Sequence, residues 1–351
     1  MSFLIYGANG YTGRLIAQEA VSRGHRPILA GRHRAQVEAL GADLGLPCRV
    51  VGLDDPNALR AALEGIGAVV HCAGPFSHTS APMAEACLRT GVHYLDITGE
   101  IAVFEALAAR DQAARAAGVT LLPGVGFDVV PSDCLALHLK ERLPSATSLT
   151  LAFQTRGAIS RGTALTAVEG LGEPGCVRRN GVLTSVPRAW QTREVEFGSG
   201  PCLAVTIPWG DVSTAWYTTG IGNIEVYIAL PARVVRGLRR ARPLGGLLGS
   251  APIRAVLGAL VRARVTGPSE QVRRAGETIV WGEVADAVGR RMAARLHGPE
   301  GYTFTAHAAV RAVERILEGG GRPGFMTPGK AFGADFALEI PGVERIDLPA
   351  A

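Results

Sequence analysis

Short apolar runs alternate with segments of helical spacing through the first third of the chain. Residues 3–6 have the pattern of a buried strand, and apolar residues then recur at helical spacing from Leu15 until Gly24 ends the run. A second apolar run follows at 27–30. The first 32 residues therefore predict a compact strand–turn–helix–strand unit.

The same alternation continues as far as residue 122. Further strands are expected at 48–51, 68–72, 93–97 and 119–122, and helices at 56–63, 82–90 and 102–117. This order predicts an α/β fold, a Rossmann-type doubly wound parallel sheet, which binds ligands beyond the carboxyl ends of its strands. Polar or glycine-rich tips at 74–79, 98–100 and 126–133 should converge there.

The pattern changes near residue 131. Longer β-rich runs such as 148–153 and 224–229 predict a mainly antiparallel sheet interrupted by helices, with a further strand at 280–284 and a helix at 303–317. We expect residues 1–130 to form a nucleotide-binding domain and residues 131–317 a second, α+β substrate domain. Residues 318–351 should return and pack on the first domain.

The stretch GANGYTG places Gly7, Gly10 and Gly13 between the first strand and the first helix. In this position glycines let the backbone approach a pyrophosphate, and helix N-terminal amides such as those of Tyr11 and Thr12 bind its charge. A tight turn without a ligand is the alternative. The order of strand, turn and helix favours dinucleotide binding.

The end of the second strand indicates which dinucleotide is bound. An NAD site usually has an acidic residue here, whereas this chain has Arg32 and no carboxylate. A guanidinium pairs with a 2′-phosphate, so the sequence favours NADP. The alternative is that Arg32 is a solvated residue at the start of a helix.

Composition excludes several classes of protein. The 351 residues are 47% hydrophobic and 19% charged, which indicates a folded globular protein. The net charge of +5, carried almost wholly by arginine, does not indicate a nucleic-acid partner. The six scattered cysteines form no CxxC pair, which argues against a metal site or a disulfide framework and favours the cytoplasm. The apolar run before Gly7 is too short for a signal peptide or a membrane span.

Residues 233–274 carry ten arginines and one acid, mixed with apolar residues. Such a basic amphipathic segment suits peripheral contact with an anionic membrane or with an acidic acyl carrier protein. The alternative is a solvated helical insertion. Pro252 and Arg254 argue against a membrane span, and a homodimer remains open.

Two groups of polar residues are candidates for the chemistry. Asp128 follows a buried strand and is a candidate proton relay or substrate anchor, with fixing of the local turn as the alternative. Asp133 fits helix capping better. His78, just beyond a glycine tip, is a second candidate donor, although a lone loop histidine is more often solvated. The chain has no Tyr-x-x-x-Lys pair, which disfavours the short-chain dehydrogenase route.

Within 156–163, a strand end leads into a helix. Ser160, Arg161 and Thr163 are candidates for binding an anionic substrate group at the N-terminus of this helix.

Six motifs together resemble the saccharopine dehydrogenase-like oxidoreductases, a group that includes the trans-acting enoyl reductases: GANGYTG, AGR, HCAGPF, HYLDITGE, GFDVVPSD and PGFMTPGKAFG. The resemblance implies an NADP-binding Rossmann domain and a second domain that supplies the substrate pocket. It also implies that Ala73, Gly74 and Pro75 lie near the nicotinamide ribose.

The expected function is NADPH-dependent reduction of a conjugated C=C bond in a small-molecule or carrier-bound acyl or polyketide-like substrate. Two alternatives remain: reduction of a C=N bond, as in a saccharopine-type amino-acid dehydrogenase, and a non-catalytic NADP-binding protein.

Overall fold

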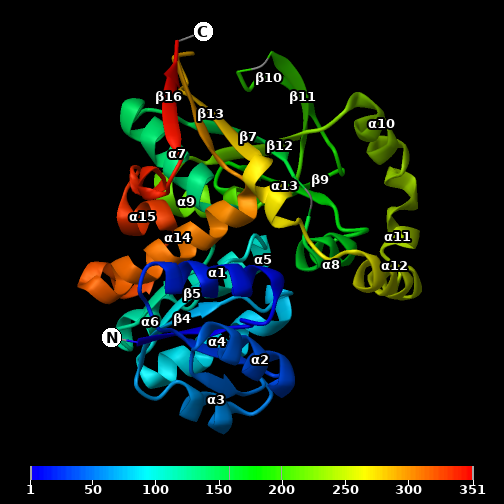
Figure 1. The fold of residues 1–351 in the computed structure, drawn as a ribbon. Helices are drawn as coiled ribbons and strands as arrows, with labels where there is room; N and C mark the ends of the chain where they lie inside the picture. The colour runs from blue at the N-terminus through cyan, green and yellow to red at the C-terminus, as the bar shows by residue number, and fades with distance from the viewer. Residues whose placement is uncertain (1, 158, 199, 350–351) are drawn as a thin grey trace. The chain divides into compact units, whose positions relative to one another are not determined.

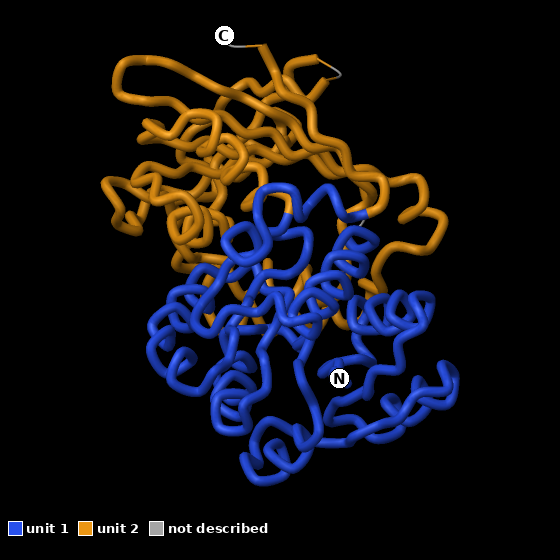
Figure 2. The backbone as a smooth tube through the Cα atoms, turned by 90° about the vertical axis from the view of Figure 1, so that its left-hand side faces the viewer, with its two compact units in different colours: residues 1–130, 302–340 blue, residues 131–301, 341–351 orange. Residues whose placement is uncertain are grey.

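The chain folds into two compact units, each assembled from two stretches of sequence (Figure 2). A computed structural model describes residues 2–157, 159–198 and 200–349. Unit 1 comprises Met1–Val130 and Tyr302–Ile340, and unit 2 comprises Pro131–Gly301 and Pro341–Ala351.

Unit 1 contains a parallel sheet, seven-stranded within the described residues, in the order β15-β6-β5-β4-β1-β2-β3. Its strands are β1 (Ser2–Tyr6), β2 (Ile28–Gly31), β3 (Cys48–Val50), β4 (Ile66–His71), β5 (His93–Asp96), β6 (Thr120–Leu122) and β15 (Gly324–Phe325). Strand order reverses between β1 and β4, which is the arrangement of a Rossmann fold. The predicted fold class is confirmed for this unit.

Helices connect the strands of unit 1 (Figure 1). They are α1 (Tyr11–Ser22), α2 (Arg34–Leu44), α3 (Pro56–Ala62), α4 (Phe76–Thr90), α5 (Ile101–Ala108), α6 (Asp111–Ala116), α14 (Gly301–Arg315), η2 (Ile316–Gly320), α15 (Pro328–Phe332) and η3 (Phe336–Glu339). The helix expected at 102–117 is two helices, α5 and α6, with a break at residues 109–110.

Helix α4 begins at Phe76, six residues before the predicted start at Pro82. The Glu100 carboxylate accepts hydrogen bonds from the Phe76 and Ser77 amides, at 2.8 and 2.9 Å, and so satisfies the N-terminus of the helix. Pro82 lies inside the helix. A contact from 24 residues along the chain thus decides where this helix starts.

Residues 302–351 are divided between the two units differently from the expectation. Helix α14, expected in the second domain, joins unit 1, where Glu19 of α1 lies 2.7 Å from the His307 ring. Phe304 and Val313 are buried. Conversely, β16 (Glu344–Leu348) belongs to unit 2 because it pairs with β14 (Arg291–Pro299). Residues 350–351 of the expected returning segment lie outside the described residues.

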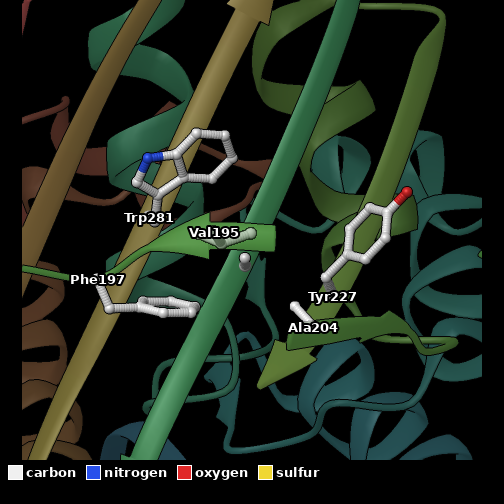
Figure 3. Close-up of a cluster of buried hydrophobic side chains, with 6 residues drawn as sticks. Val195, Phe197, Ala204, Tyr227 and Trp281 are labelled. Atoms are coloured by element: carbon white, nitrogen blue, oxygen red, sulfur yellow. The ribbon is translucent and has the colours of Figure 1, made fainter. Parts of the chain in front are cut away.

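Unit 2 is built on a mixed sheet of nine strands within the described residues. These are β7 (Ser148–Arg156), β8 (Gly175–Arg179), β9 (Val182–Val186), β10 (Thr192–Glu196), β11 (Pro201–Thr206), β12 (Asn223–Ala229), β13 (Glu277–Ala285), β14 (Arg291–Pro299) and β16. Apart from the parallel β7–β12 pair, neighbouring strands are antiparallel. Trp281, Tyr227 and Val195 gather in a buried cluster of this sheet (Figure 3).

The helices of unit 2 confirm its α+β class. They are α7 (Val130–Arg142), α8 (Arg161–Glu169), α9 (Asp211–Thr219), α10 (Ala232–Arg240), η1 (Arg242–Leu244), α11 (Gly245–Leu248), α12 (Ala251–Arg264) and α13 (Glu270–Ala275). Across the described chain, no single helix has both the length and the apolar composition of a membrane span. Only the bent pair Arg242–Leu248 and Ala251–Arg264, at 83° to each other, meets those criteria together.

Candidate functional site

The loop after β1 is shaped by its glycines. Gly7 has φ +78°, and a Cβ there would lie 2.8 Å from the Ala73 backbone nitrogen. A Cβ on Gly13 would lie within 3.0 Å of the Gly7 carbonyl oxygen, closer than real Cβ atoms approach. The glycines therefore let the start of α1 lie directly against the end of β1.

The start of α1 has the features of a phosphate-binding helix N-terminus. Gly10 is the N-cap residue, and among the described residues no side chain caps the helix. The first turn, which begins with Tyr11 and Thr12, therefore offers backbone amides at the positive end of a twelve-residue helix. This geometry fits a pyrophosphate.

The segment Ala73–Gly74–Pro75 follows β4, the strand beside β1 at the point where strand order reverses. Its contact with Gly7 places both loops at the same carboxyl edge of the sheet. Ligands of Rossmann folds bind at this edge. The roles of Ala73, Gly74 and Pro75 near a nicotinamide ribose remain predictions.

Arg32 follows β2 directly and is exposed. It forms no ion pair with a carboxylate of the described residues; its Nε donates to His33 Nε2 at 3.1 Å. Its neighbour Arg34 is instead paired with Glu38 at 2.7 Å. Arg32 is thus available to a 2′-phosphate, and the glycine loop and this arginine together fit NADP.

The buried carboxylate of Asp96, at the carboxyl end of β5, connects this strand to the loop after β6. Asp96 accepts hydrogen bonds from the Tyr94 hydroxyl at 2.6 Å and from the Thr98 and Gly124 amides at 3.0 and 2.9 Å. Burial raises the pKa of Asp96 to about 6, and these hydrogen bonds oppose that rise. The sequence analysis included Asp96 in an expected strand and in the HYLDITGE motif but gave it no role of its own. The signal that could have singled it out is a carboxylate at the end of a buried strand.

Glu100 is a second residue that the sequence analysis did not single out. By holding the Phe76 and Ser77 amides, it fixes the start of α4 immediately after the 73–75 loop. Its signals in the sequence were its place in the expected tip at 98–100 and at the end of the HYLDITGE motif.

Asp128 lies in the turn between β6 and α7 and is partly buried. A Cβ on Gly99 would lie 2.9 Å from Asp128 Oδ2, so the backbone at Gly99 lies directly beside this carboxyl group. Burial raises the pKa of Asp128 to about 7. The group therefore holds a proton for much of the time near neutral pH, as a proton donor must.

The other candidates occupy different places. His78 is exposed in the first turn of α4, a helical position and not the loop expected from the sequence. Asp133 lies inside the first turn of α7, where it accepts a 2.6 Å hydrogen bond from the Thr218 hydroxyl. Asp133 therefore connects α7 to α9 within unit 2.

In unit 2, Ser160 caps α8 by accepting a hydrogen bond from the Thr163 amide at 3.2 Å. Arg161 is exposed and donates from Nε to the Val265 carbonyl oxygen at 2.9 Å. All three residues have partners within unit 2, so their role in substrate binding remains a prediction. Ala158, in the same stretch, lies outside the described residues.

Comparison with known proteins extends this picture. Residues 3–122 match the family model of the saccharopine dehydrogenase NADP-binding domain. A trans-acting enoyl reductase of Mycobacterium leprae is 32% identical over 148 residues, 40% of this chain and 35% of that protein. The saccharopine dehydrogenase-like oxidoreductase of Mus musculus is 24% identical over 202 residues, 50% of this chain and 47% of that protein. The chain thus matches between one third and one half of the length of these relatives.

The fold matches that of a solved structure over its whole length. The L-Glu-forming saccharopine dehydrogenase of Saccharomyces cerevisiae superposes with a TM-score of 0.69, covering 99% of both chains at 10% identity. The resemblance drawn from the motifs and the NADP assignment are confirmed. Over residues 3–122, the chain is therefore similar to the NADP-binding domain of saccharopine dehydrogenases.

Proposed function

We propose that the protein is an NADPH-dependent oxidoreductase that reduces a conjugated C=C bond of an acyl or polyketide-like substrate. The observation that carries the proposal is the placement of Asp128. Its carboxyl group, with a pKa raised to about 7, follows β6 at the same carboxyl edge of the sheet as the glycine loop after β1.

NADPH, when bound, supplies a hydride to the β-carbon of the conjugated substrate. The chain's own residues hold the cofactor and supply the matching proton. Arg32 and the amides at the start of α1 bind the phosphates, and Asp128 donates its proton to the α-carbon. The resulting carboxylate is then reprotonated from water. His78, exposed at the start of α4, is the second candidate donor.

Relatives named trans-acting enoyl reductases support the choice of a C=C bond, and a carrier-bound acyl substrate fits their name. The fold shared with saccharopine dehydrogenase keeps reduction of a C=N bond as the second candidate. A non-catalytic NADP-binding protein is the third. Ser160, Arg161 and Thr163 are the proposed substrate contacts.

The deciding experiment follows NADPH consumption by the purified protein. One panel contains α,β-unsaturated acyl thioesters, and the other contains 2-oxo acids mixed with amines. Turnover of the thioesters alone supports the enoyl reductase. Turnover of the imine-forming mixtures alone replaces it with the C=N reductase, and NADPH binding without turnover of either panel favours the non-catalytic protein.

A further inference from the structure

Figure 1 shows α10, α11 and α12 following one another in unit 2. Large apolar side chains are exposed on α10, on η1–α11 and on α12. Each element contributes two of them: Val234 and Leu238, then Leu244 and Leu247, then Val256 and Leu260. Val256 is 69% exposed and Leu247 60% exposed. Single exposed apolar residues are ordinary, but a repeated set on neighbouring elements indicates a surface that binds something.

Helix α12 has two distinct long sides. The helix contacts α8, and its Gly258 is buried. Its end is held by Arg161, which donates to the Val265 carbonyl oxygen at 2.9 Å. One long side of the helix is exposed and apolar throughout; its residues are Pro252, Ala255, Val256, Ala259, Leu260 and Ala263. This spacing forms a continuous stripe along the helix.

Arginines border that stripe. At 100° per residue, Arg262 and Arg264 lie on opposite edges of the apolar stripe of α12, and both are exposed. Neither forms an ion pair with any carboxylate in the described ranges. Their charges are therefore unneutralised beside an apolar surface.

The whole segment carries one sign of charge. Residues 226–269 contain no Asp or Glu, whereas residues 233–264 contain eight arginines. Arg239 and Arg242 donate to backbone carbonyl groups at residues 188–190 and so attach α10 and η1 to the rest of unit 2. Arg233, Arg236 and Arg240 are exposed. An anionic partner would complement the charge of this surface.

We propose that α10–α12 dock unit 2 on an anionic lipid surface. The apolar stripe of α12 enters the boundary between headgroups and acyl chains, and Arg262 and Arg264 contact the lipid phosphates. The fourteen residues of α12 span about 21 Å, less than the roughly 30 Å of a bilayer core, so the helix lies in the surface and does not cross it.

A lipid surface explains more of the observations than a protein partner does. An acidic carrier protein would engage the arginines but would leave the apolar stripe in water. Protein interfaces are usually anchored by aromatic residues, and residues 231–275 contain none. The proposal does not depend on which bond the protein reduces.

Vesicle flotation of the full chain tests the proposal. One set of vesicles contains phosphatidylglycerol and phosphatidylcholine in equal parts, and the other contains phosphatidylcholine alone. Two variants alter the surface: Val256→Asp/Leu260→Asp places charges in the stripe, and Arg262→Gln/Arg264→Gln removes its border. The matched controls are Val288→Asp, at a valine that is 79% exposed outside the segment, and Arg60→Gln/Arg322→Gln at two other exposed arginines.

We expect the wild type to float with the anionic vesicles only. Each surface variant should bind these vesicles at least about tenfold more weakly than the wild type. The controls should bind like the wild type, and all variants should retain NADPH binding, which reports a folded chain. Failure of the wild type to bind anionic vesicles at low salt overturns the proposal, as does full binding by Val256→Asp/Leu260→Asp. If the chain binds a purified acidic carrier protein but no vesicles, the carrier protein replaces the lipid as the partner. If the chain is a dimer that Val256→Asp/Leu260→Asp dissociates, a second copy of the chain replaces the lipid.

Discussion

Arg32 stands where an acidic residue would contact a ribose 2′-hydroxyl in an NAD site. Its guanidinium is exposed and forms no ion pair with a carboxylate of the described chain, so its charge is available to a ligand. The selectivity of the site for NADPH over NADH should therefore depend on this single side chain.

Replacing Arg32 by alanine should weaken NADPH binding by about tenfold to a hundredfold and leave NADH binding nearly unchanged, because only NADPH carries the 2′-phosphate. Fluorescence titration with each cofactor measures both dissociation constants. Arg34→Ala is the matched control, since Arg34 is already paired with Glu38. Equal losses for NADPH and NADH would contradict the assigned role.

From the raised pKa of Asp128, we predict that both activity and stability depend on pH. With a pKa near 7, the carboxyl group donates a proton only below about pH 7, so the turnover rate should fall as pH rises through that value. The folded-state pKa lies above the ordinary value of 3.8, so the folded chain binds the extra proton between about pH 4 and 7. Stability from this group is therefore present at low pH and is lost as pH rises to 7.

Asp128→Asn tests both effects. Turnover should fall by about a hundredfold or more and lose its inflection near pH 7, because an amide cannot donate the proton. In urea denaturation, the wild type should lose more stability than the variant between pH 5 and pH 8. Asp43→Asn, at an exposed carboxylate paired with Arg14, should leave the rate profile unchanged. A retained inflection near pH 7 in Asp128→Asn would assign it to another group.

At the scale of the element, the junction of β1 and α1 depends on the absence of side chains. A Cβ on Gly13 would lie within 3.0 Å of backbone atoms of Gly7 and Ala8, which cannot move aside as a flexible side chain can. The strand end and the helix start would then have to separate, and with them the amides that bind phosphate.

Gly13→Ala should lower the free energy of unfolding by about 1–3 kcal/mol and weaken NADPH binding by more than about tenfold. Chemical denaturation and cofactor titration measure the two effects. Gly237→Ala in α10 is the control: nothing lies within 4 Å of the added Cβ, so it should stabilise its helix by up to about 1 kcal/mol. Wild-type NADPH affinity in Gly13→Ala would show that the close approach is unnecessary.

At the scale of the whole molecule, unit 1 needs sequence from both ends of the chain. Strand β15 extends the sheet beside β6, and α14 contributes buried residues such as Phe304, Val310 and Val313. Glu314 of α14 also lies 2.8 Å from the His25 ring. Residues 1–130 alone would expose the surfaces that these segments cover.

A fragment of residues 1–130 should therefore unfold without a cooperative transition and bind no NADPH. A chain that joins residues 1–130 to 302–340 through a flexible linker should restore both properties, because it supplies α14 and β15. Thermal denaturation and NADPH titration compare the two. Cooperative unfolding of the short fragment would mean that the C-terminal segments are dispensable.

The sequence predicted local structure where local interactions decide it. The start of α3 at Pro56 is such a case, because the Asp55 side chain caps it from the adjacent position. The start of α4 is the opposite case, because its amides are satisfied by Glu100, which no pattern near Pro82 reveals. The segment 102–117 likewise has helical spacing throughout, yet the helix is interrupted between α5 and α6.

By itself, the sequence determined the parallel βαβ order, the glycine loop and the preference for NADP, because these depend on hydrophobic period, on glycine geometry and on the charge at one strand end. Only the tertiary structure decided that α14 joins unit 1 and β16 joins unit 2. It alone showed the hydrogen bonds that Asp96 and Glu100 accept and the burial that raises the pKa values of Asp96 and Asp128. The physical reason is that burial and pairing join residues far apart in the chain, and no local pattern encodes which distant surface a segment will cover.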